Sequence, residues 1–294
     1  MKTQTRAYFF AITAILCWST VATAFKLALK GMDFLQLLGI VSGVAALFLL
    51  VILLLQGKLS LLKQTTFKDI QSSALLGLLN PFLYYAGLLK AYSLLSAQLA
   101  LSLNYIWPIT LVLLSIPLLK QKIGWKSIIA ILISFIGVLV IANKGSFSNI
   151  NLTNPLGIGL ALASSIIWAL FWIFNVRDRR EDILKLLLNF AFGFVYINIA
   201  IALFSDFRIP DSNSLWAAVY IGMVECGLAY VFWLKAMQST TTTDKISNLV
   251  FLSPFISLIF IHLILGENIH LSTLCGLVLI VTGILLQQFI RKKQ

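Results

Sequence analysis

Charged residues are scarce in this chain. Asp, Glu, Lys and Arg together make up 11% of its 294 residues, whereas 60% of the residues are hydrophobic. A soluble domain has about a quarter of its residues charged. The composition therefore excludes an ordinary soluble domain and predicts an integral membrane protein. The net charge of +12 comes from basic residues at the ends of apolar runs, which is typical of contacts with lipid headgroups and not of nucleic-acid binding.

Cysteine and histidine are also rare. The three cysteines, Cys17, Cys226 and Cys275, are odd in number and all lie inside apolar runs, which argues against a disulfide framework or a thiol catalyst. The two histidines lack a second pair of ligands, so we expect no metal site. The phosphate-binding pattern GxxxxGK[ST] is missing, which excludes ATP hydrolysis by this chain. We therefore expect no cofactor and no enzyme activity.

Long apolar runs, in contrast, are abundant. A helix needs about 20 mostly apolar residues to cross a bilayer, and short polar connections separate ten runs of this kind. The runs cover residues 7–29, 32–55, 69–89, 95–119, 124–142, 155–175, 183–205, 213–235, 241–265 and 271–290. Lys and Arg are concentrated in the loops on the side of the N-terminus, which predicts that both termini are cytoplasmic. The predicted fold class is an all-α integral membrane protein with ten transmembrane helices.

The two halves of the chain resemble each other. The stretch GLLNPFLYYAGLLKAY from Gly77 aligns with GMVECGLAYVFWLKAM from Gly222, with matching Gly, Leu, Tyr and Leu-Lys-Ala positions. The longest polar segment, NKGSFSNINLTNP, separates a first repeat at 1–146 from a second at 147–294. Because each repeat has an odd number of spans, the second crosses the membrane in the opposite sense. Two inverted five-helix repeats around a central cavity are typical of secondary transporters.

Two spans contain a proline at matching positions of the repeat, Pro108 in LSLNYIWPITLVLLS and Pro254 in FLSPFISLIF. Proline removes one backbone hydrogen bond and kinks a helix, and in lipid the freed carbonyl must find another partner. Matching interruptions in the two halves indicate a substrate site near the middle of the membrane. A kink that serves packing alone is the alternative.

Glu225 is the only acidic residue deep inside a predicted span. Insertion scales give a cost of about 2.5–3.5 kcal/mol for an acidic residue at the bilayer centre, so this side chain is expected to face protein or water. It could carry a proton, pair with a cationic group of a substrate, or form a structural hydrogen bond between helices. Asn80 occupies the corresponding position of the first repeat, and both side chains are expected to project into one cavity.

Aromatic and amide side chains share helical faces with these polar and interrupted positions. The rings would stack on a substrate of partly aromatic or amphipathic character, and Asn104 and Asn248 would hydrogen-bond to it. For Trp18, Trp107 and Trp168, simple core packing is the alternative. The predicted substrate-binding residues are Trp18, Asn80, Tyr84, Asn104, Trp107, Trp168, Glu225, Tyr230, Trp233 and Asn248.

These patterns resemble the drug/metabolite transporter superfamily, and its EamA-type members in particular. The resemblance rests on the five-plus-five repeat, on Trp18 and Trp168 in the first span of each half, and on FLSPFISLIFIHLILGE (251–267). The NYIWP stretch is similar to the equivalent helix of the aromatic amino acid exporters. The resemblance implies ten helices around a central cavity, and export or exchange of small metabolites, amino acids or drugs across a bacterial inner membrane.

The predicted function is secondary active transport of small metabolites by alternating access, with amino acids or aromatic and amphipathic compounds as candidate substrates. The expected partners are a small-molecule substrate and membrane lipid, with protons as a candidate coupling ion and a monomer or homodimer as the assembly. Two alternatives come from other classes: an intramembrane enzyme acting on lipid, and a channel-like membrane protein. Replacing Glu225 by Gln is predicted to alter the pH dependence of transport if this side chain takes part in coupling.

Overall fold

The computed structural model describes residues 3–119, 125–142, 154–205, 209–239 and 248–291, and within these ranges it contains helices and no strand. The helices up to residue 142 are α1 (Thr3–Ala28), α2 (Phe34–Leu55), α3 (Ser60–Lys63), α4 (Phe67–Gly77), α5 (Tyr84–Leu94), α6 (Ala97–Asn104), α7 (Trp107–Leu119) and α8 (Trp125–Ala142). The later ones are α9 (Pro155–Arg177), α10 (Asp182–Phe204), α11 (Ser212–Met223), α12 (Tyr230–Ser239), α14 (Ser253–Leu265) and α15 (Leu271–Arg291). Three irregular helical segments join some of them: the π-helices η1 (Leu78–Leu83) and η2 (Val224–Ala229), and the 3-10 helix η3 (Asn248–Leu252).

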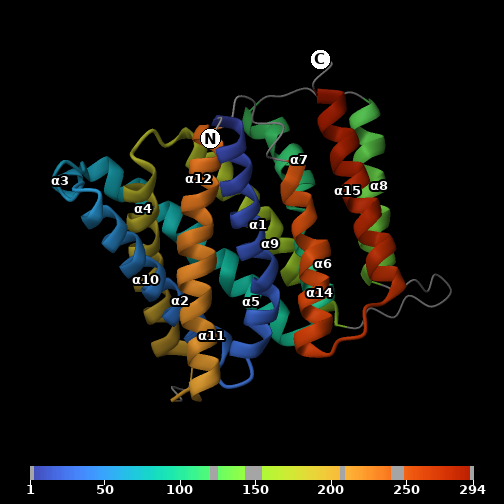
Figure 1. Ribbon diagram of the computed structural model, residues 1–294, viewed down its shortest axis with the longest axis horizontal. Helices are drawn as coiled ribbons and strands as arrows, with labels where there is room; N and C mark the ends of the chain where they lie inside the picture. The colour runs from blue at the N-terminus through green and yellow to red at the C-terminus, as the bar shows by residue number, and fades with distance from the viewer. Residues whose placement is uncertain (1–2, 120–124, 143–153, 206–208, 240–247, 292–294) are drawn as a thin grey trace.

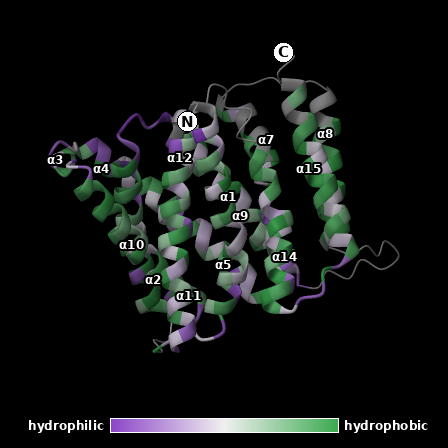
Figure 2. Cartoon of the chain, viewed as in Figure 1, coloured by the Kyte–Doolittle hydropathy of each residue, from purple (hydrophilic) through white to green (hydrophobic). Residues whose placement is uncertain are grey.

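Six helical stretches are long and apolar enough to cross a membrane. They cover Thr5–Ala28, Phe34–Leu55, Phe67–Leu94, Pro155–Asn175, Asp182–Phe204 and Ser212–Trp233, and shorter apolar helices cover Ile129–Ile141, Leu249–Leu265 and Leu271–Leu286. Figure 2 shows hydrophobic residues along the helices and hydrophilic residues gathered at the two ends of the bundle. In Figure 1, α1 begins and α15 ends at the same end of the bundle. This arrangement fits a bilayer between the two polar ends.

Helices α1 and α9 each lie among helices from the other half of the chain. Helix α1 packs against α11, α12 and α14, whereas α9 packs against α5, α6 and α7. Two further pairs also join the halves, α2 with α10 and α8 with α15. In Figure 1 the α8 and α15 pair stands at one side of the molecule. Contacts between the halves therefore surround the middle of the molecule.

Glycines bring α8 and α15 together. A Cβ atom on Gly137 would lie 2.6 Å from the carbonyl oxygen of Gly276, and one on Gly276 would lie 2.7 Å from the carbonyl oxygen of Gly137. Nearby, the Ser134 hydroxyl donates to the Ile280 carbonyl over 3.1 Å. Helices in lipid gain no hydrophobic stabilisation by associating, so the close van der Waals packing that small residues allow stabilises the pair instead.

The chain leaves regular α-helix geometry before each predicted proline interruption. Helix α6 ends at Asn104 and α7 begins at Trp107, one residue before Pro108; η3 ends at Leu252 and α14 begins at Ser253, one residue before Pro254. Proline suits the first turn of a helix, because its missing N–H would have no helical partner there. The prolines therefore begin new helical segments instead of bending continuous ones.

Ion pairs hold the loop between α9 and α10 against its neighbours. Lys58 pairs with Glu181 over 2.8 Å, and Arg180 forms a bidentate contact with Asp178. Burial raises the pKa of the Asp178 carboxyl, but hydrogen bonds from Arg180 outweigh burial and hold this pKa below the ordinary aspartate value. This end of the bundle is the one at which α1 begins and α15 ends (Figure 1).

Candidate functional site

A cavity of about 170 Å³ lies where helices of both halves meet. Its walls come from α1, α5, α6, α7, α9, η2, α12, η3 and α14. The residues that line it are Trp18, Val21, Ala22, Phe25, Tyr84, Leu88, Tyr92, Leu101, Asn104, Tyr105, Trp107, Trp168, Trp172, Glu225, Tyr230, Trp233, Val250 and Ser253. An apolar, ring-rich wall with a few polar groups is the usual composition of a small-molecule site.

Aromatic rings from both halves contact one another around this cavity. Tyr84 of α5 stacks on Trp168 of α9 with ring centroids 4.5 Å apart. Trp18 of α1 lies 5.4 Å from Trp233 and 6.4 Å from Tyr230, both of α12. Tyr230 also meets Trp168 edge-to-face at 6.5 Å. The rings form a continuous chain of contacts across the two halves, which holds each of them in a defined orientation.

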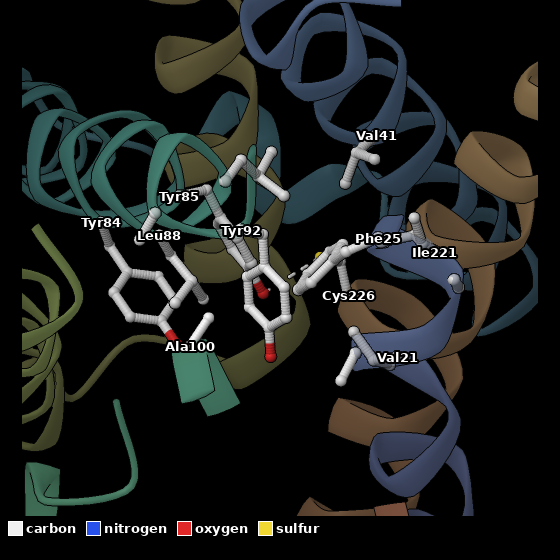
Figure 3. Close-up of a cluster of buried hydrophobic side chains, with 14 of the residues drawn as sticks. Val21, Phe25, Val41, Tyr84, Tyr85, Leu88, Tyr92, Ala100, Ile221 and Cys226 are labelled. Carbon is white, nitrogen blue, oxygen red and sulfur yellow. Dashed lines mark hydrogen bonds between the residues drawn. The ribbon is translucent and has the colours of Figure 1, made fainter. Parts of the chain in front are cut away.

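Glu225 is the charged residue of this wall, within the part of the chain that the structure describes. The Tyr85 hydroxyl donates to Glu225 Oε1 over 2.9 Å, and the Cys226 thiol lies 3.5 Å from the same hydroxyl. The other carboxyl oxygen, Oε2, is buried without a hydrogen-bond partner among the described residues. Figure 3 shows Tyr85 and Tyr92 of α5 facing Phe25 of α1, with Cys226 beside them. The carboxyl group is therefore held on one side and unsatisfied on the other.

Asn104 joins the two halves at the opposite wall. It accepts a hydrogen bond from the Tyr84 hydroxyl over 3.3 Å and donates one to Ser164 of α9 over 2.8 Å. The amide ends α6, where the chain turns before Pro108. Its donor and its acceptor are both engaged with protein, so Asn104 orients the Tyr84 ring at the cavity surface.

The backbone interruption of each half lies close to that of the other. The Tyr105 hydroxyl, in the turn between α6 and α7, donates to the Val250 carbonyl of η3 over 2.6 Å. A backbone carbonyl at this depth needs such a partner, because lipid offers none. Ser19 of α1 donates to Ser253 over 3.3 Å at the start of α14. Polar side chains of neighbouring helices thus satisfy the broken helices.

Most of the predicted substrate-binding residues meet at this cavity. The lining includes Trp18, Tyr84, Asn104, Trp107, Trp168, Glu225, Tyr230 and Trp233. The side chains of Asn248 and Pro108 lie outside the described residues. Pro254 is buried directly after the lining residue Ser253.

Asn80 does not belong to this lining. It is fully buried inside η1, with an extended backbone (φ −146°, ψ 120°), and neither end of its amide has a partner among the described residues. The two π-helices have corresponding neighbours, since η1 packs against α9 and α10 and η2 packs against α1 and α2. Despite this correspondence, Glu225 of η2 lies in the cavity lining, whereas the Asn80 side chain is buried outside it.

Sequence reasoning missed Tyr85 and Ser164, which orient the predicted residues Glu225 and Asn104. It also missed Tyr92 and Tyr105 in the lining. The alignment of the two halves pairs Tyr85 with Tyr230, and this pairing is the signal that could have identified Tyr85. Ser164 carries no such signal, because serine is common in membrane helices. Among the described residues, no group of His, Cys, Asp and Glu side chains is arranged to hold a metal ion.

Known proteins resemble this chain over nearly its whole length. An uncharacterized transporter of Clostridium kluyveri is 27% identical over 98% of this chain and 94% of its own. The uncharacterized transporter YyaM of Bacillus subtilis is 26% identical over 83% of this chain and 80% of its own. One solved crystal structure superposes with a TM-score of 0.69 over 99% of both chains at 20% identity, which shows a shared fold.

The model of the EamA-like transporter family matches this chain twice, at residues 5–143 and 155–287. The matches cover most of the sequence, and the similar relatives carry the name transporter. Together with the apolar spans, they describe a multi-pass membrane protein. The chain belongs to the EamA-like transporter family.

Proposed function

We propose that this protein is a secondary active transporter that moves small solutes by alternating access, as an exporter or exchanger. The observation that carries the proposal is the central cavity, whose aromatic and polar wall is assembled from both halves of the chain. A site near the middle of the membrane, formed by interrupted helices, is the usual arrangement in secondary transporters. The substrates are small metabolites, with amino acids and aromatic or amphipathic compounds as candidates.

The proposed architecture is two inverted repeats of five helices, 1–146 and 147–294. Three features support it. The family model matches once in each half. The π-helices η1 and η2 occupy corresponding positions, as do the segments that begin before Pro108 and Pro254. The packing is reciprocal, because α1 lies among helices of the second half and α9 among helices of the first.

Such a pair of repeats explains how one chain could open to either side. When the repeats exchange conformations, the cavity opens toward the opposite face, giving two states of comparable energy. We propose the bacterial inner membrane as the location, with both termini cytoplasmic. A proton is a candidate coupling ion, and the assembly is a monomer or a homodimer. In this proposal the protein catalyses no covalent reaction.

Counterflow in liposomes tests the proposal. Purified protein in vesicles loaded with unlabelled solute should accumulate the labelled form transiently, in a saturable manner, when amino acids and amines are screened. Trp168→Ala removes a cavity ring and should lower the counterflow rate about tenfold, since each aromatic contact contributes on the order of 1 kcal/mol or more. Trp216→Ala is the matched control, because this tryptophan is 68% exposed on α11 and should leave the rate unchanged.

Other outcomes would contradict the proposal. An ohmic conductance that does not saturate would indicate a channel, and formation of a chemically altered lipid or solute would indicate an enzyme. If Trp168→Ala and Trp216→Ala lowered the counterflow rate equally, the cavity would not be the transport site.

A further inference from the structure

We propose that the cavity is selective for organic cations: amines or quaternary ammonium compounds with an aromatic or aliphatic body and no carboxylate. This inference rests on the proposed function and names its substrate class. It comes from the charges and hydrogen-bond partners of the cavity wall, taken together.

Within the described residues, the ionisable side chain of the wall with acid character is a single carboxyl group. Glu225 lines the cavity, and no Lys or Arg belongs to the lining among the described residues. Glu225 Oε1 accepts a hydrogen bond from the Tyr85 hydroxyl, and Glu225 Oε2 is buried with no hydrogen-bond partner in the described part of the chain. A buried carboxylate in lipid needs an opposite charge or a donor. An ammonium group entering the cavity would supply both.

Aromatic rings supply the remaining recognition surface. The centroid of the Trp18 ring lies 6.4 Å from that of Tyr230 and 5.4 Å from that of Trp233. All three rings line the same cavity as Glu225. The negative face of an aromatic ring attracts a cation, most strongly where water is excluded. Rings around a single carboxylate therefore favour a positively charged, partly apolar solute.

Among the described residues, the wall offers no cationic side chain to a carboxylate group. Breaks in membrane helices bind anions when the free N–H groups at a helix start point into the site. Here the first turn of α7 is already satisfied, because the Ile109 and Thr110 N–H groups donate to the Ile106 carbonyl over 2.8 and 3.2 Å. Helix α14 continues directly from η3, and Pro254 has no N–H to donate.

A cation does lie in the next cavity. Lys26 lines a separate cavity near the end of α1, and Tyr92 borders both cavities. A second lysine, Lys30, and the carboxyl group of Glu267 share that second cavity with Lys26, so its lysines lie outside the lining that contains Glu225. A zwitterionic amino acid bound at Glu225 would thus place its carboxylate among apolar rings. Amines avoid this cost.

Several polar groups of the wall have partners already. Asn104 is bonded to Tyr84 and Ser164, the Tyr105 hydroxyl to Val250, and Ser253 to Ser19. A solute with many hydroxyl groups would compete with these bonds. The Tyr230 hydroxyl, like Glu225 Oε2, is buried without a hydrogen-bond partner among the described residues, and can accept a hydrogen bond from an ammonium group.

A matched series of solutes tests this selectivity on purified protein, by quenching of tryptophan fluorescence. The series holds one aromatic body and changes only the charge: 2-phenylethylamine (cation), phenylalanine (zwitterion), 3-phenylpropionate (anion) and 2-phenylethanol (neutral). We expect the amine to bind about tenfold or more tightly than each of the other three. Equal or tighter binding of any of the three, or no binding of the amine at millimolar concentration, would overturn the inference.

Two variants locate the effect. Glu225→Gln should lose about tenfold or more of the affinity for 2-phenylethylamine and keep that for 2-phenylethanol. Glu181→Gln removes a carboxylate in the loop before α10 and should behave as the unmodified protein. An unchanged preference for the amine in folded Glu225→Gln contradicts the proposal. If Glu225→Gln does not fold, the solute series on the unmodified protein decides alone.

The result separates this inference from the proposed function. If the amine binds selectively but no solute shows counterflow, transport is refuted and the cation site stands. If neutral or anionic solutes undergo counterflow and Glu225→Gln does not affect it, transport stands and the cation site is refuted.

Discussion

The Glu225 side chain is held by the hydroxyl of Tyr85, a fully buried tyrosine in α5. Burial makes this contact important, because a hydrogen bond to a charged group contributes more in a dry environment than in water. The neighbouring Tyr84 has a different role, since its hydroxyl meets Asn104 and its ring meets Trp168. Two adjacent residues of one helix thus position groups on two walls of the cavity.

Replacing Tyr85 by Phe tests this positioning role. The ring remains and fills the same space, but the donor to Glu225 is lost. We expect the affinity for a solute that depends on Glu225 to fall about tenfold, because such a hydrogen bond contributes roughly 1.5–3 kcal/mol. Tyr196→Phe is the matched control, since its hydroxyl bonds to the Ala74 carbonyl at 3.3 Å away from the cavity lining. Equal affinities in the two variants would show that Tyr85 does not orient Glu225.

At the scale of helices, the site depends on segments that are not regular. The breaks before Pro108 and Pro254 place Tyr105 and Val250 opposite each other, and η2 places Glu225 against α1. In contrast, α8 and α15 are regular and pair closely with each other, and none of their described side chains belongs to the cavity lining. The site therefore combines the interrupted segments with the continuous helices α1 and α9.

The close contact between α8 and α15 gives a prediction about stability. Gly137→Ala places a Cβ 2.6 Å from the Gly276 carbonyl oxygen, a backbone atom that cannot move aside easily. We expect a loss of about 1–3 kcal/mol from overpacking, measured as a lower melting temperature in detergent. Gly159→Ala is the control, because a Cβ at Gly159 of α9 meets nothing within 4 Å and should leave stability equal or slightly higher. A Gly137→Ala protein as stable as Gly159→Ala would contradict the tight packing.

The amino-acid sequence predicts the positions of the helices better than the contacts within the candidate site. Six of the ten predicted runs correspond to helical stretches long and apolar enough to cross a membrane, and three others correspond to shorter apolar helices. Apolar runs predict helices because a polar backbone in lipid must bond within its own segment. The proline positions also predict where helices are interrupted. The contacts of Glu225 with Tyr85 and of Asn104 with Ser164 join residues 140 and 60 positions apart in the chain, and spacing along a helix does not predict such contacts. Asn80 differs from Glu225 despite their alignment, since its backbone is extended inside η1 and its side chain is buried outside the cavity lining.

At the scale of the whole molecule, the proposed inverted repeat makes a prediction about topology. In a variant without the three native cysteines, Leu156→Cys at the start of α9 should react with a membrane-impermeant maleimide added to intact cells; Leu156 is 61% exposed. A cysteine added after Gln294 should react only after the cells are opened, because the basic loops favour a cytoplasmic C-terminus. Labelling of both positions from the same side would rule out the inverted arrangement.

The hydrogen bond from the Tyr105 hydroxyl to the Val250 carbonyl bears on whether either half of the chain is stable alone. The carbonyl that Val250 leaves free in the later half is capped by a side chain of the earlier half, and Asn104 reaches Ser164 in the same way. Expressed separately, either half would enter the bilayer with polar groups facing hydrocarbon. The proposed halves are therefore not expected to fold independently, and co-expressed fragments are expected to become stable only after they associate.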